Sequence, residues 1–168
     1  MVKSPVPISL HSPSRLSGLL CCLLMALCLM ACQPRHVSTS DYRSLPDEGW
    51  RAGSPVALTP QFPDSAATYA VRLVVRNTVD YAYSNLNLAV DLIDSQGGVV
   101  RSNVQFTISD GFGNFLGSGF GAYYQSSVVL ASGITPERLR KVVVWPAMRQ
   151  VRLLQGIVDV GIILEPEN

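Results

Sequence analysis

A chain of 168 residues with 48% hydrophobic and 15% charged side chains has the size and apolar content of one domain with one core. Its 13 basic and 12 acidic side chains nearly balance, for a formal net charge of +1 at pH 7. This balance excludes the broad basic surface that nucleic-acid binding requires, so no nucleic-acid partner is expected.

The N-terminal segment has the pattern of a secretory signal peptide. Residues 1–15 carry Lys3 and Arg15 without any acidic side chain, and Leu19–Ala31 then form an uninterrupted apolar run of 13 residues. A membrane-spanning helix needs about 20 apolar residues, so a retained transmembrane anchor is the weaker interpretation. We expect residues 1–31 to be removed during export.

The end of the apolar run, Leu29–Cys32, resembles the lipobox of bacterial lipoproteins. The resemblance implies cleavage after Ala31, a thioether-linked diacylglycerol on Cys32 and an acyl chain on its new amine. Two or more chains, at about 0.8 kcal/mol per buried methylene, anchor a protein stably, whereas one chain does so only marginally. The alternative is an ordinary signal peptide followed by an incidental cysteine.

Cysteine and histidine positions restrict the chemistry of the mature chain. Cys21, Cys22 and Cys28 lie in the removed segment, and lipidation would consume Cys32. The mature chain then has no disulfide and no free thiol, so its core alone must hold it together. His36 is its only histidine. We therefore expect no metal ion, no cofactor and no Ser-His-acid triad.

A polar segment follows the lipidated cysteine. Residues 33–49 contain Pro34 and Pro46 and show no apolar period, which predicts a flexible tether. The predicted organisation is a signal peptide over residues 1–31, the lipidated cysteine and tether over 32–49, and one domain over 50–168.

The domain shows the two-residue alternation of half-buried strands. In residues 69–76 and 85–92, every second side chain is apolar and those between are polar or small apart from Val74, and turn signals such as Asp94–Gly98 separate the segments. The pattern predicts an all-β fold, an antiparallel β-sandwich of the jelly-roll or immunoglobulin-like kind. The expected strands are Val56–Leu58, Tyr69–Arg76, Asn85–Leu92, Val99–Ser109, Gln125–Leu130, Leu139–Trp145 and Ile157–Leu164.

Several segments, in order along the mature chain, resemble the gliding-motility lipoprotein H (GldH) family of the Bacteroidetes. The family often has Pro where this chain has Ala82 and Leu154, and neither departure touches a reactive group. The resembling segments are Asp41–Pro46, Gly49–Trp50, Val75–Asn77, Asp80–Leu86, Gly113–Gly121, Ala147–Gln150 and Leu154–Gly161.

The resemblance implies a lipid-anchored β-sandwich without catalytic residues, required for gliding and associated with the type IX secretion machinery. The expected partners are a membrane, through Cys32, and other envelope proteins of motility and secretion. Gln33 is not the Asp that commonly retains lipoproteins at the inner membrane, and residues 33–36 lack acids. We therefore expect the periplasmic face of the outer membrane. The alternative function is an envelope lipoprotein that binds carbohydrate or peptidoglycan.

Two loops are candidates for partner binding, because tyrosine and asparagine are frequent in binding loops and glycines allow unusual backbone angles. The spacing of the glycines in residues 111–121 does not fit a phosphate-binding loop. The alternative is that both loops have only a structural role and pack onto the sandwich. The candidate residues are Tyr81, Tyr83 and Asn85 in one loop and Asn114, Phe115 and Phe120 in the other.

Carboxylates leave two weaker hypotheses open. Paired carboxylates catalyse glycoside hydrolysis, and Asp91, Asp94, Asp110 and Asp159 could approach one another in the fold. Oxygen ligands in the loop that joins Asp110 to Asn114 could hold calcium, although their spacing does not follow that of an EF-hand.

Overall fold

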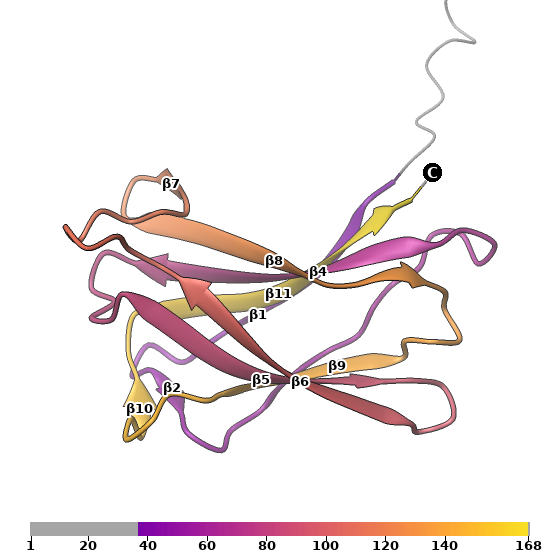
Figure 1. Cartoon of the computed structure of the whole chain (residues 1–168), viewed down its shortest axis with the longest axis horizontal. Coiled ribbons are helices and arrows are strands. Elements are labelled where there is room, and N and C mark those ends of the chain that lie inside the picture. Colours follow the sequence, from indigo (N-terminus) through magenta and orange to yellow (C-terminus); the bar gives the residue numbers. More distant parts are fainter. Residues whose placement is uncertain (1–36, 168) are drawn as a thin grey trace, which may run out of the picture. The chain divides into compact units, whose positions relative to one another are not determined.

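The structure, a computed structural model, describes residues 37–167, which form strands and turns without any helix in that range (Figure 1). Two large antiparallel sheets face each other, as the sequence predicted. The first sheet has the order β1 (Thr39–Ser44), β11 (Ile157–Pro166), β4 (Tyr69–Thr78), β8 (Tyr123–Ile134), β7 (Ser118–Phe120). The second has the order β3 (Val56–Leu58), β9 (Lys141–Pro146), β5 (Asn85–Ile93), β6 (Val99–Thr107), and a small ribbon pairs β10 (Leu153–Leu154) with β2 (Trp50–Arg51).

The strand order is that of a jelly roll. Apart from the β5–β6 and β7–β8 hairpins, each connection between the large sheets leads from one sheet to the other. The chain thus winds β1-β11-β4-β8 onto β3-β9-β5-β6, and β6 and β8 end up at the same open side of the sandwich. Of the two kinds of sandwich that the sequence left open, the structure has the jelly roll.

The core consists of the apolar rows that the alternation predicted. The inward side chains of β4 and β11 in the first sheet are buried against those of β5 and β9 in the second. Each such side chain contributes about 1.5–3 kcal/mol through its removal from water. The rows are Tyr69, Val71, Leu73 and Val75; Leu86, Leu88 and Val90; Val160, Ile162 and Leu164; Val142 and Val144.

The predicted tether is wrong for its second half. Residues 39–44 form β1, which pairs with β11 from Thr39 opposite Leu164 to Ser44 opposite Asp159. The sandwich accordingly includes β1 and does not begin at residue 50. The segment lacks an apolar row because β1 is an edge strand, whose hydrogen bonds come from the backbone.

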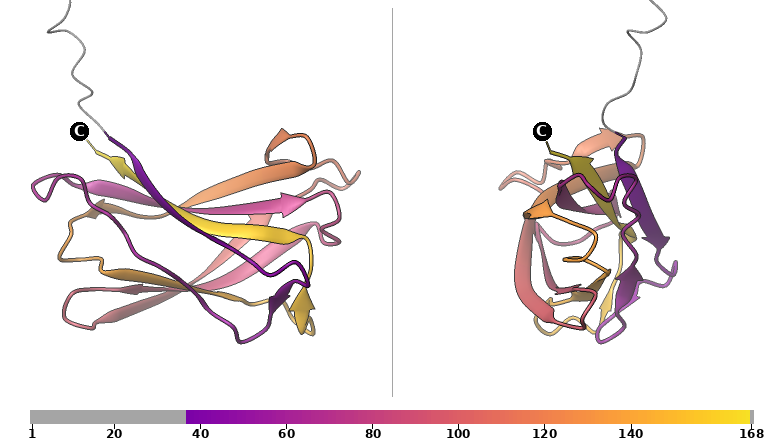
Figure 2. Two further views of the ribbon diagram at one scale, coloured as in Figure 1. Left: turned by 180° about the vertical axis from the view of Figure 1, so that it is seen from behind. Right: turned by 90° about the vertical axis from the view of Figure 1, so that its right-hand side faces the viewer.

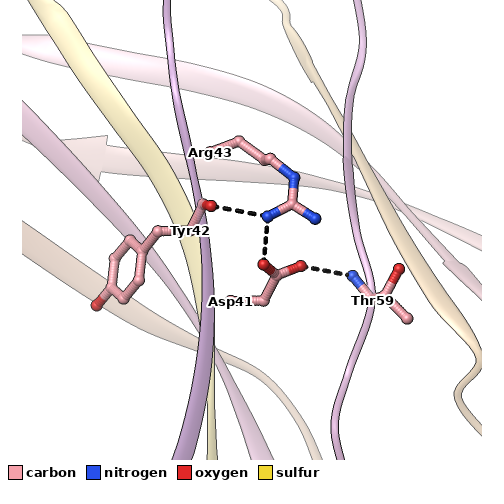
Figure 3. A network of polar contacts seen from close by, with 4 residues as sticks. All are labelled: Asp41, Tyr42, Arg43 and Thr59. Atoms are coloured by element: carbon pink, nitrogen blue, oxygen red, sulfur yellow. Dashed lines mark hydrogen bonds and ion pairs between the residues drawn. The ribbon is translucent and has the colours of Figure 1, made fainter.

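Polar side chains further fix β1 to the rest of the sandwich (Figure 3). Asp41 accepts a hydrogen bond at 2.9 Å from the backbone N–H of Thr59, just beyond β3. Arg43 donates to the other carboxylate oxygen of Asp41 at 2.5 Å and to the carbonyl of Tyr42 at 2.9 Å. One carboxylate therefore connects the edge of the first sheet to the strand that begins the second.

The predicted signal peptide, Cys32 and the first part of the tether lie outside the described residues. Within residues 37–167 there is no helix of the length and apolar character needed to cross a bilayer.

Candidate functional site

The loop between β4 and β5 holds one buried and one exposed tyrosine. Tyr81 is buried and donates a hydrogen bond from its hydroxyl to the carbonyl of Asn85 at 2.8 Å. Burial, and secondly the neighbouring Tyr83, raise the pKa of Tyr81. The two rings meet edge to face with centroids 5.7 Å apart, and Tyr83 remains 39% exposed. Tyr81 thus stabilises this loop from inside the fold, and Tyr83 is the tyrosine of the loop that remains accessible to a ligand or partner.

The glycine-rich loop is organised by Asp110. One carboxylate oxygen accepts the backbone N–H groups of Phe112 and Asn114, both at 2.9 Å, and the other accepts the side-chain amide of Asn114. These hydrogen bonds hold the pKa of the Asp110 carboxyl below its usual value, with the bonds from Asn114 foremost. Because its oxygens already face N–H donors, this carboxylate is poorly placed to bind the calcium ion considered above.

The aromatic residues of this loop have different roles. Phe115 lies stacked on Tyr124 with ring centroids 4.5 Å apart, so it packs the loop onto β8. The side chain of Phe120 lies outside what the structure describes. Phe112, which was not among the candidate binding residues of this loop, is 94% exposed at the tip of the loop. Composition could not show which of the two is exposed, because burial depends on the residues that pack around each ring.

The structure brings the two predicted loops together at one end of the sandwich. The backbone N–H of Ile108 donates to the carbonyl of Ser84 at 2.8 Å, and that of Val79 donates to Ala122 at 3.2 Å. Besides Tyr83, four exposed apolar side chains occur at this end, and we call these four the apolar tip: Val79, Phe112, Leu116 and Tyr123. Exposed apolar side chains that gather in one place mark sites of interaction more often than scattered ones do.

A second feature lies beside Tyr83, on the outer face of the second sheet. A hollow of about 580 Å³ has a floor made by β5 and β6 and a wall made by the segment after β9. Four side-chain amides line its floor, and we call it the amide groove: Asn85, Asn87, Asn103 and Gln105. Of these, only Asn85 was predicted as a site residue. The other three could have been found from the sequence, because amides recur at the polar positions of two neighbouring predicted strands, 85–92 and 99–109.

The carboxylates that could have formed a catalytic pair each have a partner of their own. Asp91 receives two hydrogen bonds from Arg101, at 2.6 and 2.7 Å, and Asp159 receives one from Ser44 at 2.8 Å. Asp94 caps the β5–β6 turn. Within the described part of the chain, no three His, Cys, Asp or Glu side chains are grouped as a metal site requires.

Comparison with known proteins gives the family. The model of the GldH lipoprotein family matches residues 37–164, which include all the strands of the sandwich except the last two residues of β11. The chain belongs to this family. It is 29% identical over 146 residues to a gliding motility lipoprotein GldH homolog of Christiangramia forsetii, covering 82% of this chain and 88% of the relative. It is 26% identical over 158 residues to the gliding motility lipoprotein GldH of Flavobacterium johnsoniae, covering 90% and 97%.

Solved structures are similar only distantly. The coat protein of tomato aspermy virus aligns with a TM-score of 0.41 at 9% identity, over 87% of this chain and 94% of that one. A family 16 carbohydrate-binding module aligns with a TM-score of 0.25 at 13% identity, over 66% and 68%. Similarities of this size carry no argument about function.

Segments that carried the GldH resemblance meet on the outer face of the first sheet. The guanidinium of Arg76 on β4 lies 4.6 Å from the ring centroid of Tyr42 on β1. It also contacts Asp159 on β11 at 3.5 Å, and Asp159 accepts the hydroxyl of Ser44. This cluster joins β1, β11 and β4. Part of the sequence pattern shared with the family therefore consists of residues that hold β1 in the first sheet.

Proposed function

We propose that this GldH-family chain is a lipid-anchored, non-enzymatic component of the cell envelope that serves gliding motility and the associated type IX secretion machinery. Cys32 carries the lipid, the sandwich faces the periplasm from the outer membrane, and the apolar tip contacts a partner protein. The names of both relatives support the link to gliding.

The observation that carries this proposal is the position of the apolar tip relative to the start of β1. Thr39 lies beside Leu164, which lies beside Val71 near the beginning of β4. The tip lies at the opposite end of β4, where Thr78 pairs with Tyr123. Seven residues of strand separate the two ends by about 25 Å, and the left view of Figure 2 shows the start of β1 and the end of β4 on opposite sides of the sandwich.

This arrangement suits a protein held at one end that binds at the other. Cys32 precedes Val37 by five residues, so the anchor can lie no farther than about 18 Å from the start of the sandwich. The membrane then lies on the side of β1, and the apolar tip points away from it. An apolar surface directed into the aqueous space is suited to contact with a protein partner.

A test of the anchor replaces the lipidated cysteine. We expect acyl mass on Cys32 of the purified wild-type protein, and we expect Cys32→Ser to leave an unprocessed or soluble protein that fails to restore colony spreading to a strain lacking the gene. Secretion of a type IX cargo protein, measured in the same strains, tests the association with secretion. Spreading and secretion that both survive deletion of the gene would refute the proposal.

A second test replaces the tip. Phe112→Ser should reduce spreading while the protein remains at its normal level in the membrane, because Phe112 makes few contacts within the fold. Val100→Ser is a matched control, since Val100 is 67% exposed but lies at the start of β6, near the β5–β6 turn. Equal spreading of the two variants would contradict the role of the tip.

A further inference from the structure

The amide groove combines four amides on two paired strands. Asn87 on β5 lies directly opposite Gln105 on β6. Asn85 is two residues along β5 from Asn87, and Asn103 is two residues along β6 from Gln105, so all four point to the same outer face. Their neighbours on the strands, such as Leu88 and Phe106, point into the core.

These amides are not used by the fold. Among the hydrogen bonds of residues 37–167, none involves the side-chain amide of Asn85, Asn87, Asn103 or Gln105. Each amide group offers two N–H donors and a carbonyl acceptor. The floor of the groove therefore presents an array of paired donors and acceptors that only water or a ligand can satisfy.

The lining of the groove is almost free of charge. Arg149 is the one charged residue among those that line it, and no carboxylate does so. Asp91 lies farther along β5, and its charge is paired with that of Arg101. A charged ligand would find little to neutralise it on this floor, whereas hydroxyl groups, which both donate and accept, match amides without any charge.

Apolar side chains lie at one end of the groove and along its wall. Tyr83 lies at one end, and its ring is held by the edge contact with the buried Tyr81. Met148 and Val151 form part of the wall, and the backbone N–H of Asn87 points at the sulfur of Met148 at 3.3 Å. A fixed tyrosine ring provides contact area at low entropic cost, and a few convergent polar groups beside apolar walls are typical of ligand sites.

We propose that the amide groove binds an uncharged oligosaccharide chain, which lies along β5 with its hydroxyl groups on the amides and one sugar face against Tyr83. This site differs from the glycan-binding surface considered from the sequence. That surface used Tyr81 and Tyr83 together with the glycine-rich loop; the groove retains only Tyr83 of these rings, because Tyr81 is buried and Phe115 of the glycine-rich loop packs onto Tyr124. The proposal does not depend on the apolar tip or on a role in gliding.

The test is calorimetric titration of the full-length lipidated protein, solubilised in a polyoxyethylene detergent whose head group is not a sugar. The probes are chitotetraose, cellotetraose and maltotetraose, which are neutral, and tetragalacturonic acid, which is charged. We expect at least one neutral probe to bind with an affinity insensitive to salt, because no ion pair contributes. We expect the charged probe to bind at least tenfold more weakly.

Variants of the groove identify the site. Asn87→Ala with Gln105→Ala, and separately Tyr83→Ala, should weaken binding about tenfold or more, as the loss of two hydrogen bonds or one aromatic contact predicts. The thermal unfolding midpoint should not change, since the fold does not use these amides. Gln96→Ala is the control, because Gln96 is an exposed amide on the same hairpin that does not line the groove.

Four outcomes overturn the proposal: no neutral probe binds, the variants bind as the wild type does, binding depends on salt and on Arg149, or an extended peptide binds in place of the sugars. Because the groove variants retain Cys32 and Phe112, failure here leaves the proposed function intact, and failure of the spreading assays leaves the groove intact.

Discussion

The ring of Tyr42 on β1 covers Gly161 on β11. The two residues lie opposite each other in the register, and a Cβ added to Gly161 would lie 2.6 Å from Cε1 of Tyr42. On its other side, the first sheet continues to Val74 on β4, which is fully buried although it belongs to the outer row. The glycine is therefore required for space, since its backbone does not need the left-handed region.

We predict that Gly161→Ala destabilises the protein by about 1–3 kcal/mol, the usual penalty for inserting a methyl group into a filled site. Urea denaturation measures the change. Gly111→Ala is the control, because a Cβ at Gly111 meets nothing within 4 Å and its φ is not positive. If the two variants were equally stable, the packing of Tyr42 on this glycine would not matter.

Acid should weaken the ion pair between Asp91 and Arg101 by protonating the Asp91 carboxylate. Hydrogen bonds from Arg101, and then its charge, hold the pKa of Asp91 below the usual value of about 3.9. A group whose pKa is lower in the folded state stabilises the fold above its unfolded pKa, and that stability is lost as the pH falls through the folded pKa.

We therefore expect the thermal midpoint to be steady from pH 7 to about pH 5 and to fall below pH 4. Asp91→Asn should flatten this fall, because the amide does not titrate. The pKa of Asp110 is also lowered in the folded state, so Asp110→Asn should likewise flatten the fall of the midpoint in acid. A wild-type midpoint that did not decline between pH 5 and pH 2.5 would contradict the assignment.

Asp110→Ala should free the loop that presents Phe112. The carboxylate accepts three N–H groups of Phe112 and Asn114, and without it the loop opens more often. Chymotrypsin should then cleave after Phe112 several-fold faster, as followed by mass spectrometry. Asp94→Ala is a matched control, because Asp94 caps the β5–β6 turn with the same i+2 and i+4 hydrogen bonds. Faster cleavage at Phe112 in the control would exclude a local effect.

The two tyrosines of the β4–β5 loop should respond differently to substitution. Tyr81→Phe removes the bond to Asn85 and should cost about 1 kcal/mol, and Tyr81→Ala should cost about 3–5 kcal/mol through the cavity it leaves. Tyr83→Ala should remain within about 0.5 kcal/mol of the wild type, because the ring is half exposed. Urea denaturation gives all three values. A large effect of Tyr83→Ala would make it unsuitable as a probe of the groove.

The alternation of apolar and polar residues predicted the central strands and missed the edge strand β1. In β4 and β5 apolar residues occupy the inward positions, apart from Asn77 near the end of β4, because these strands lie between two neighbours and over the core. β1 has one aromatic, Tyr42, and is otherwise polar, because it is held by backbone pairing and by Asp41. Edge strands with this kind of attachment carry no local hydrophobic signal.

The candidate sites were predictable to a similar extent. The sequence identified both loops at the apolar tip, because tyrosine, asparagine and glycine gather in them. It could not tell Tyr81 from Tyr83, since their burial depends on the residues packed around them. The amide groove was missed because Asn87 and Gln105 lie 18 residues apart in the sequence and meet only through the register of β5 and β6.

The pairing of β1 with β11 has a mechanical consequence. A pull on residue 37 against a load at the far end of the sandwich acts along the axis of β1, and the bonds of the β1–β11 ladder run across that axis. Such a pull loads the six paired positions of the ladder in shear, all at once, whereas a pull at right angles would peel them apart one after another. A domain attached in this way resists extension most strongly in the direction in which its own anchor would draw it.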